Sequence, residues 1–333
     1  MSTISEVAKR AGVSAATVSR VLNGKRHVAD STRSRVLLAA EELGYTPSRA
    51  AQTLARGRAT TVGVLAHMAS SPSVAERLGG LSARLAPSGN DLVLFDVESA
   101  SRRRAVLREL ADPERVGVVV LISIRPTPEE IAIFQEVGVP IVVVDARVPD
   151  LDCTYVDNME GGRLAARALL ASGHREIAFI GDIEDNEFDF TASRDRRVAF
   201  EDVLGTASLQ LDSEYVQLVP HGRSPARRAA QRLFALDAPP TAIFAASDVQ
   251  ASGVLEAAQD RGLEIPRDLS VIGFDDIQSS RGMGLTTIRQ PLEESGAYGA
   301  KLALEAIEHQ PMGLAIELPL SLVSRRSTGP PPT

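Results

Sequence analysis

The sequence predicts an all-α headpiece at the N-terminus, followed by an α/β core of two doubly wound, parallel-sheet subdomains. Two observations predict this fold class. Residues 3–22 have the spacing of a helix, a glycine turn and a second helix. From Thr60 onward, short apolar runs alternate with helical stretches, as in doubly wound α/β layers. More than about seven such runs indicate two sheets rather than one.

The composition is that of a soluble globular protein. The chain has 333 residues, of which 44% are hydrophobic and 24% charged, enough for two or three domains. It contains no apolar run of the roughly 18 residues that a membrane helix needs, and its N-terminus lacks a signal-peptide pattern. Cys153 is the only cysteine, which excludes an internal disulfide. The sequence therefore predicts a cytoplasmic protein with no membrane contact.

The charge of the chain is divided unevenly. Residues 1–60 contain ten Lys and Arg against four Asp and Glu, a net charge of +6. The remaining residues contain 26 against 39, a net charge of −13, so the overall value of −7 hides a basic head on an acidic body. Such a division localises nucleic-acid contact at the N-terminal end.

The first two helices are predicted from their caps. Thr3 and Glu6 have the spacing of a capping box, which opens a helix that runs to Ala11. Gly12 supplies a turn, and Ser14 is a suitable N-cap for the next helix. In that helix Val18, Val21 and Leu22 form one apolar stripe.

The opposite face of the second helix is slim enough to enter the major groove of DNA. It carries small or hydrogen-bonding side chains and one arginine: Ala15, Ala16, Thr17, Ser19 and Arg20. Arginine binds guanine, and hydroxyl groups bind phosphate. The alternative is an ordinary amphipathic surface helix.

A third helix is predicted from about Asp30. Val36, Ala40 and Leu43 would point inward, and Gly44 would lie just beyond its end, at the C′ position. Three short helices of this kind share one small core. This arrangement favours a DNA-binding headpiece over an isolated surface helix.

These residues also carry a resemblance. Residues 3–14 (TISEVAKRAGVS) and 17–24 (TVSRVLNG) resemble the headpiece of the lactose-repressor (LacI/GalR) family, and the match continues through 44–48 (GYTPS) to Ala55. The resemblance implies a headpiece over 1–46 that binds double-stranded operator DNA. The residues expected to contact that DNA are Ser14, Ala15, Ala16, Thr17, Ser19, Arg20, Asn23 and His27.

Residues 47–58 are predicted to form a hinge helix between a proline and a glycine. A helix of roughly ten residues is marginal by itself in water and needs a partner to order it. In the resembled family this helix forms on operator binding, and the leucine that matches Leu54 is wedged into the minor groove, where such a wedge kinks the duplex. Ala51 is a further expected contact. The alternative is a plain interdomain linker.

The core is predicted from buried strands and the helices between them. Strands are expected at 61–66, 91–97, 116–124, 141–145, 177–181, 242–246 and 270–274, and helices at 73–85, 128–137, 161–172, 225–235 and 249–261. The resemblance implies the periplasmic-binding-protein-like (type I) fold. Its chain crosses between the two lobes three times, here near Asp157, Gln290 and Leu320. The expected core is 59–326, with an N-lobe of about 59–157 and 290–320, a C-lobe of about 158–289 and 321–326, and a tail over 327–333.

Ligands of open α/β sheets bind at the carboxyl ends of strands. Several polar residues lie at or just after the ends of predicted strands, although helix capping or a turn is the alternative role for each: His67, Arg125, Asp145, Ser247, Asp248, Asp275 and Asp276. The resemblance places further residues in a small-molecule (effector) pocket: Arg196 in 192–196 (ASRDR), Ser247 and Asp248 in 246–248 (ASD), Asp275 in 273–276 (GFDD), and Gln290 in 286–291 (TTIRQP). Carboxylates and guanidinium groups suit a sugar-like, polyhydroxylated effector.

One departure from the family concerns aromatic side chains. Many members have an Asn-Pro-Phe-Phe-like stretch after the first strand, whereas this chain has Ser71-Pro72-Ser73-Val74 and no tryptophan. Less stacking on a sugar is therefore expected. His67, Arg125, His221 and Arg223 would add positive charge to the cleft, which leaves an anionic effector open; the alternative is that they are solvated rim residues.

No enzyme, cofactor or metal site is predicted. The chain has no Gly-x-Gly-x-x-Gly or Walker loop after a strand, no metal-ligand spacing among its five histidines, and no Gly-x-Ser-x-Gly elbow. The predicted function is a homodimeric transcriptional regulator, a repressor, that binds a pseudo-palindromic operator and responds to a small molecule. The alternative is a solute-binding protein of the same α/β fold, which would have no use for residues 1–57.

Overall fold

The computed structural model describes residues 2–22, 28–45, 59–185, 188–309 and 311–332. The chain divides into two compact units, residues 1–60 and 61–333. None of the described helices is long and apolar enough to cross a membrane.

The first unit is a bundle of three helices, α1 (Ile4–Ala11), α2 (Ala15–Leu22) and α3 (Asp30–Glu42). The predicted capping box at Thr3 and Glu6 is confirmed, and Gly12 ends α1 with a left-handed backbone, φ +66°. The predicted N-cap is also confirmed, because the Ser14 hydroxyl oxygen accepts a hydrogen bond from the Thr17 amide at 3.1 Å. Buried side chains from all three helices form one core: Val7, Ala8, Ala11, Val18, Val21, Val36, Ala39 and Ala40.

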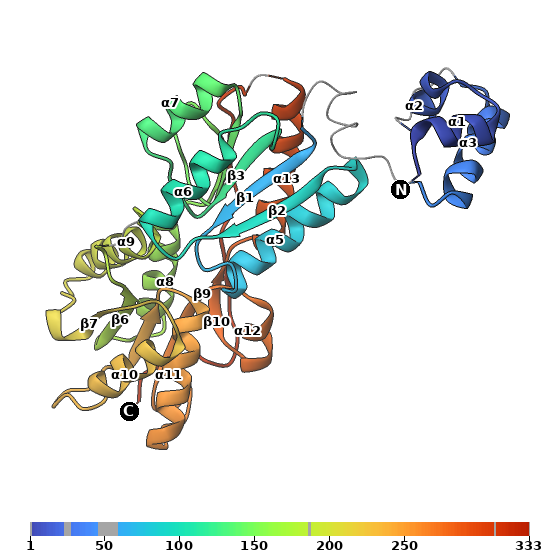
Figure 1. The fold of residues 1–333 in the computed structure, drawn as a ribbon. Helices are drawn as coiled ribbons and strands as arrows, with labels where there is room; N and C mark the ends of the chain where they lie inside the picture. Colours follow the sequence, from blue (N-terminus) through green and yellow to red (C-terminus); the bar gives the residue numbers. More distant parts are fainter. Residues whose placement is uncertain (1, 23–27, 46–58, 186–187, 310, 333) are drawn as a thin grey trace. The chain divides into compact units, whose positions relative to one another are not determined.

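The second unit contains two six-stranded sheets (Figure 1). The first sheet has the order β11-β5-β4-β3-β1-β2 and is parallel throughout. Its strands are β1 (Thr61–Ala66), β2 (Asp91–Asp96), β3 (Val118–Ile122), β4 (Ile141–Val144), β5 (Asp152–Tyr155) and β11 (Ala315–Glu317).

The second sheet has the order β12-β10-β9-β8-β6-β7. It is parallel except for β12, which runs antiparallel to β10. Its strands are β6 (Ile177–Asp182), β7 (Val216–Val219), β8 (Ala242–Ala245), β9 (Ser270–Asp275), β10 (Thr286–Arg289) and β12 (Ser321–Val323).

Helices cover both faces of each sheet, so each lobe has two apolar layers. On the first sheet, α5 (Pro72–Leu85) and α13 (Leu292–Glu308) pack on one face, and α6 (Ala100–Leu110) and α7 (Pro128–Val137) on the other. On the second, α8 (Asn158–Ala171) and α9 (Ala192–Thr206) oppose α10 (Arg223–Leu233) and α11 (Asp248–Arg261). The short helix α12 (Gln278–Met283) follows β9. Two 3₁₀ turns, η1 (Ala86–Ser88) and η2 (Ser213–Tyr215), precede β2 and β7.

The chain passes between the two sheets three times: between β5 and α8, between β10 and α13, and between β11 and β12. The predicted fold class, a helix-turn-helix headpiece with a two-sheet α/β core, is therefore confirmed. All seven expected strands are present. Five further strands were not predicted, namely β5, β7, β10, β11 and β12. These have only three or four residues, and several are half exposed, so they lack a long apolar run.

The segment expected as a tail packs against the second lobe. Ser327 is buried, and its hydroxyl donates to the carbonyl oxygen of Val271 at 2.7 Å. The carbonyl oxygen of Gly329 lies 3.0 Å from Nε2 of the buried His174. Residues 327–329 therefore belong to the second lobe and pack against the beginning of β9.

Candidate functional site

The exposed face of α2 is the candidate nucleic-acid interface. Ser14, Ala15, Ala16 and Arg20 are exposed, and Thr17 and Ser19 are partly exposed. No carboxylate of the described residues pairs with the Arg20 guanidinium. This slim face carries Arg20 and lies opposite the buried stripe of Val18 and Val21. Four other predicted DNA contacts, Asn23, His27, Ala51 and Leu54, lie outside the described residues.

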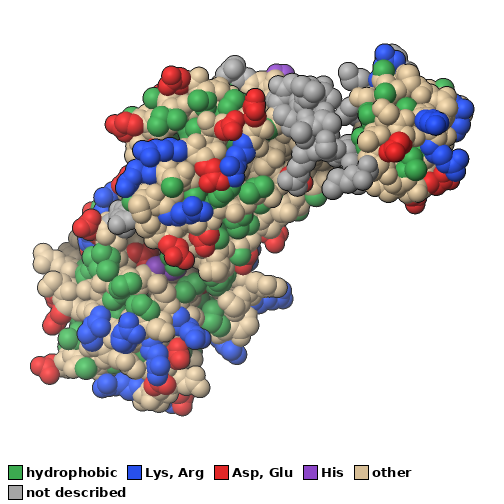
Figure 2. Space-filling model, viewed as in Figure 1, with side chains coloured by type: hydrophobic (Ala, Val, Ile, Leu, Met, Phe, Trp, Pro, Cys, Tyr) green, Lys and Arg blue, Asp and Glu red, His purple; other side chains and the backbone are tan. Residues whose placement is uncertain are grey.

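The candidate effector site is a cavity of about 430 Å³ where the carboxyl ends of the two sheets face each other. In Figure 2 the hollow between the two lobes is bordered by hydrophobic, acidic and histidine side chains. Six of the eight predicted effector residues line this cavity: His67, Asp145, Arg196, Ser247, Asp275 and Gln290. Asp145 and Asp275 both have positive φ angles, +71° and +122°, which is a costly backbone conformation that often occurs at functional sites.

Arg196 is held rigidly on the second-lobe side of the cavity. Its Nε donates to Asn158 Oδ1 at 2.8 Å, and its Nη1 donates to the Ala246 carbonyl oxygen at 2.6 Å. Helices α8 and α9 touch through their backbones at this residue, since a Cβ added at Gly162 of α8 would overlap the Arg196 carbonyl oxygen. Burial lowers the pKa of Arg196, and the nearby carboxylate of Asp275 partly offsets this effect.

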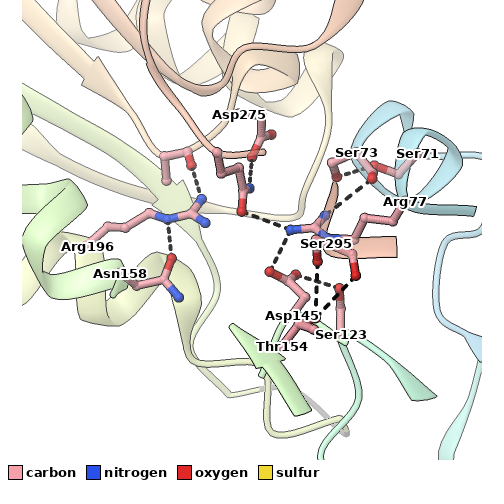
Figure 3. Close-up of polar contacts among 12 residues, drawn as sticks. Ser71, Ser73, Arg77, Ser123, Asp145, Thr154, Asn158, Arg196, Asp275 and Ser295 are labelled. Carbon is pink, nitrogen blue, oxygen red and sulfur yellow. Dashed lines mark hydrogen bonds and ion pairs between the residues drawn. The ribbon is translucent and has the colours of Figure 1, made fainter. Parts of the chain in front are cut away.

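Arg77 lies on the first-lobe side, opposite Arg196 (Figure 3). Its Nη2 donates to Asp145 Oδ1 at 2.5 Å and to Gln290 Oε1 at 2.9 Å. Gln290 Nε2 in turn donates to Asp275 Oδ1 at 2.5 Å. Burial raises the pKa of Asp275, while the charges of Arg196 and Arg77 act in the opposite direction.

His221 and Asp182 form an ion pair at the cavity, with His221 Nδ1 3.0 Å from Asp182 Oδ1. Gln250 Nε2 donates to the same carboxylate oxygen at 2.9 Å. Burial alone would lower the pKa of His221, but the hydrogen bond and charge of Asp182 raise it overall. When His221 is protonated, Asp182 balances its positive charge within the protein.

Aromatic side chains reach the cavity from the loop after β6. Phe188 and Phe190 line it, and the Phe188 ring stacks on His67 with centroids 4.1 Å apart and an interplanar angle of 22°. His67 Nδ1 lies 2.7 Å from the Val97 carbonyl oxygen, which can only accept, so Nδ1 carries the hydrogen. The sequence predicts few aromatic side chains around the effector. Phe188 and Phe190 partly make up for this, and they come from a loop that lies far from the first strand in the sequence.

Two predicted effector residues lie elsewhere. Arg125 lines a neighbouring cavity of about 270 Å³ with Arg147 and Asp157. Asp248 is fully buried behind the cavity wall, where it accepts hydrogen bonds from Thr287, Ser280 and Ile277. Burial, together with the charge of Asp275, raises the pKa of Asp248 to about 7. Asp248 therefore ties α11 to the segments after β9 and to β10, and it is not part of the cavity lining.

Only two of the four cations considered for an anionic effector line this cavity. Arg223 points to Glu256 on α11 at 3.7 Å, and Arg125 lines the neighbouring cavity. His67 and His221 line the main cavity, but each is bonded to an acceptor of the protein. The charge balance that favoured an anionic ligand is therefore not supported.

Sequence reasoning missed Arg77, Ser123, Asp182, Phe188 and Phe190 as cavity residues. A signal existed for the arginine, because Arg77 lies on the apolar stripe that Val74, Leu81 and Leu85 form on α5. A signal also existed for Asp182, which directly follows the apolar run of β6. The two phenylalanines gave no such signal, since they lie in an irregular loop.

Comparison with known proteins identifies both parts of the chain. Residues 3–48 match the family described as bacterial regulatory proteins, lacI family, and residues 166–328 match a periplasmic binding protein-like domain. The chain is 34% identical to the HTH-type transcriptional repressor PurR of Erwinia tasmaniensis over 340 residues, covering all of this chain and 98% of the relative. It is 33% identical to the PurR of Shigella sonnei, with the same coverage.

Solved structures agree in fold over nearly the whole chain. The lac repressor dimer bound to operator and the anti-inducer ONPF has a TM-score of 0.84 at 25% identity, covering 98% of this chain and 99% of that one. The complex of the transcriptional regulator CelR with cellobiose has a TM-score of 0.71 at 28% identity, covering 98% and 100%. These relatives are transcriptional regulators, so the alternative of a solute-binding protein without a regulatory role is not favoured. The chain belongs to the LacI family of bacterial regulatory proteins and is a transcriptional repressor with a DNA-binding headpiece and an effector-binding domain.

Proposed function

We propose that α2 reads the major groove of a pseudo-palindromic operator through Ser14, Ala15, Ala16, Thr17, Ser19 and Arg20. Two further contacts, Asn23 and His27, follow α2 in the chain, and Ala51 and Leu54 act from the hinge. The support is the exposed, slim face of α2 and the net charge of +6 in residues 1–60. Two copies of the chain bind two half-sites of the operator in the cytoplasm, where the DNA is. The similar lac repressor is likewise a dimer bound to operator.

The effector occupies the cavity between the lobes and contacts His67, Asp145, Arg196, Ser247, Asp275 and Gln290. One observation carries this proposal: Arg196 and Asp275 from the second lobe and Asp145 from the first line the same cavity. A ligand that touches both lobes binds one lobe arrangement better than another. It thereby changes the affinity of the headpieces for DNA, since the two free energies are linked.

The effector is an uncharged, polyhydroxylated molecule such as a sugar. The cavity's guanidinium and imidazole groups already have partners within the protein, while the carboxylates keep further lone pairs for ligand hydroxyl groups. The carboxylates Asp145, Asp182 and Asp275 line the same cavity and would repel an anion. The neutral class is therefore favoured over the phosphorylated one.

DNA recognition is tested by operator titration of Arg20→Ala against the matched control Arg35→Ala. Both variants remove one exposed arginine from the headpiece, but Arg35 lies on α3. Losing a bidentate base contact costs about 1–3 kcal/mol. We expect Arg20→Ala to weaken operator binding much more than binding to random DNA, and Arg35→Ala to affect both alike. An equal loss on both DNAs for Arg20→Ala would make Arg20 a phosphate contact.

The effector site is tested by thermal shift with D-ribose, cellobiose, glucose 6-phosphate and adenine, for the wild type and Asp275→Asn. A ligand that binds only the native state raises the melting temperature. We expect a neutral sugar to raise the melting temperature of the wild type and to lose this effect in Asp275→Asn. A shift by glucose 6-phosphate alone would overturn the neutral class, and a shift that survives in Asp275→Asn would place the ligand outside this cavity.

A further inference from the structure

Arg77 is a charged residue on the buried face of a helix. It belongs to α5, its side chain is 2% exposed, and its neighbours on the same stripe are Val74, Leu81 and Leu85. Burying a guanidinium is unfavourable unless it is paired and hydrogen-bonded. Apolar packing alone would therefore not stabilise Arg77 at this position, and its guanidinium needs specific hydrogen-bond acceptors.

The guanidinium reaches three acceptors. Nη2 donates to Asp145 Oδ1 and to Gln290 Oε1, and Nη1 donates to the Ser73 carbonyl oxygen at 3.3 Å. Arg77 Nε is the buried side-chain atom that has no partner among the described residues. The guanidinium therefore does not use all its donors, and its two Nη2 contacts are the ones that reach beyond α5.

These contacts fix the polar groups of the first lobe. Asp145 Oδ1 accepts from Arg77, and Asp145 Oδ2 accepts from the Ser123 hydroxyl at 2.7 Å. Both carboxylate oxygens are therefore directed by neighbours on α5 and just after β3 (Figure 3). The carboxylate cannot rotate without giving up a charge-assisted hydrogen bond.

Arg77 also fixes the amide of Gln290 and, through it, a carboxylate of the second lobe. A guanidinium can only donate, so the amide end that faces Arg77 must be the oxygen, Oε1. The other end, Nε2, then faces Asp275 Oδ1 and donates to it. One donor on α5 thus decides which end of Gln290, 213 positions later in the chain, meets Asp275.

The backbone of Arg77 is held at the same junction. A Cβ added at Gly296 of α13 would overlap the Arg77 carbonyl oxygen, so the two helices touch through their backbones at this point. Helix α13 begins at Leu292, two residues after Gln290. Both ends of the Arg77–Gln290 contact are therefore anchored by one helix pair.

From these contacts we infer that Arg77 is a positioning residue that locks the effector-facing groups of the two lobes, Asp145 and Asp275, into one arrangement through Gln290. The inference rests on the proposed function only for the role of these carboxylates as effector contacts. Arg77 thus connects the two lobes at the cavity through hydrogen bonds to Asp145 and to Gln290, which in turn donates to Asp275. A change at Arg77 therefore alters the second lobe as well as the first.

The test is amide hydrogen exchange of the full-length protein without effector or DNA. We compare the wild type with Arg77→Met, which keeps the side-chain length but removes the donors, and with Arg84→Met, a control at an exposed position of the same helix. Arg77→Met should raise exchange about tenfold at residues 273–278 and 286–291 of the second lobe. Arg84→Met should leave that exchange unchanged.

Two further variants separate positioning from general destabilisation. Asp145→Asn removes the ion pair but keeps an acceptor for Arg77 and the Arg77–Gln290 contact, so its effect should stay in the first lobe. Gln290→Glu keeps the acceptor but loses the donor to Asp275, so its effect should stay in the second lobe. If Arg77→Met changes exchange only in the first lobe, or if Asp145→Asn loosens the second lobe equally, the inference is overturned. Because no effector is present, a failure of the proposed effector site leaves this result unaffected.

Discussion

The guanidinium carbon of Arg196 lies 3.4 Å from the centroid of the Phe274 ring. This contact stacks the arginine on the last aromatic residue of β9, directly before Asp275. A buried cation on an aromatic face gains a favourable electrostatic interaction, and the flat guanidinium keeps its hydrogen bonds in the plane of the group. The pair fixes the position from which Arg196 faces the cavity.

Replacing Arg196 by lysine should destabilise the protein. Lysine cannot stack its charge over Phe274 while bonding both Asn158 Oδ1 and the Ala246 carbonyl oxygen. We expect Arg196→Lys to lower the free energy of unfolding by about 1–3 kcal/mol in urea titrations. The control Arg194→Lys changes a half-exposed arginine of the same helix and should be close to neutral. Equal stability of the two variants would show that the planar group is not required.

A glycine contact between α8 and α9 gives a second prediction. A Cβ at Gly162 would overlap the Arg196 carbonyl oxygen, which is backbone and cannot move aside easily. Gly162→Ala should therefore cost about 1–3 kcal/mol. The control is Gly205→Ala on α9, where an added Cβ meets nothing within 4 Å. Thermal unfolding of this control should show a gain of about 0.5–1 kcal/mol, because alanine favours a helix. A neutral Gly162→Ala would mean that the helices can separate at low cost.

Asp248 should make stability depend on pH. Its pKa is about 7 in the folded protein, raised by burial, whereas an unfolded aspartate titrates near 4. Between these values the unfolded chain releases a proton that the folded protein keeps, so the free energy of unfolding falls as pH rises from about 4 to about 7. Above about pH 7 this group no longer changes the free energy of unfolding as pH rises.

Asp248→Asn should remove this dependence. Its carbonyl oxygen can still accept from the Ile277 amide and Ser280, and its NH₂ can donate to Thr287. We compare the free energy of unfolding of the variant with that of the wild type by urea titration. This difference should be roughly 2–4 kcal/mol more favourable to the variant at pH 8 than at pH 4. The control Asp260→Asn, at a half-exposed position of the same helix, should show a much smaller difference. Parallel pH curves for the wild type and Asp248→Asn would contradict the raised pKa.

His221 should titrate above the usual histidine range, which centres near 6.5. Burial lowers its pKa, but the hydrogen bond to Asp182 and the charge of Asp182 raise it by more. The stabilisation by this pair is therefore fully present below the pKa of His221 in the unfolded chain, and it is lost as pH rises through the pKa in the folded protein. The NMR titration of the ring proton should move below the usual value in Asp182→Asn, since burial remains and the charge is gone. An unchanged midpoint in that variant would assign the shift to another group.

The elements that could be predicted from the sequence are those whose causes are local. The capping box at Thr3 and Glu6, the left-handed turn at Gly12 and the strand at Thr61–Ala66 depend on residues a few positions apart. The headpiece motif also predicted the family, because the residues that match it lie in one continuous stretch, 3–48. Strand ends then pointed to Asp145, Asp275 and His67, since in parallel sheets these ends meet at one edge.

Which side chains of the two lobes meet depends on the tertiary structure and could not be predicted from the sequence. Arg77 and Gln290 are 213 positions apart, and Phe188 reaches His67 from the other lobe. Asp248 follows the same local rule as Asp145 but points into the lobe, because Thr287 and Ser280 offer it hydroxyl donors there. The side-chain direction at a strand end depends on which distant donors lie within hydrogen-bond distance, and the packing of the two sheets, rather than any local pattern, sets those distances.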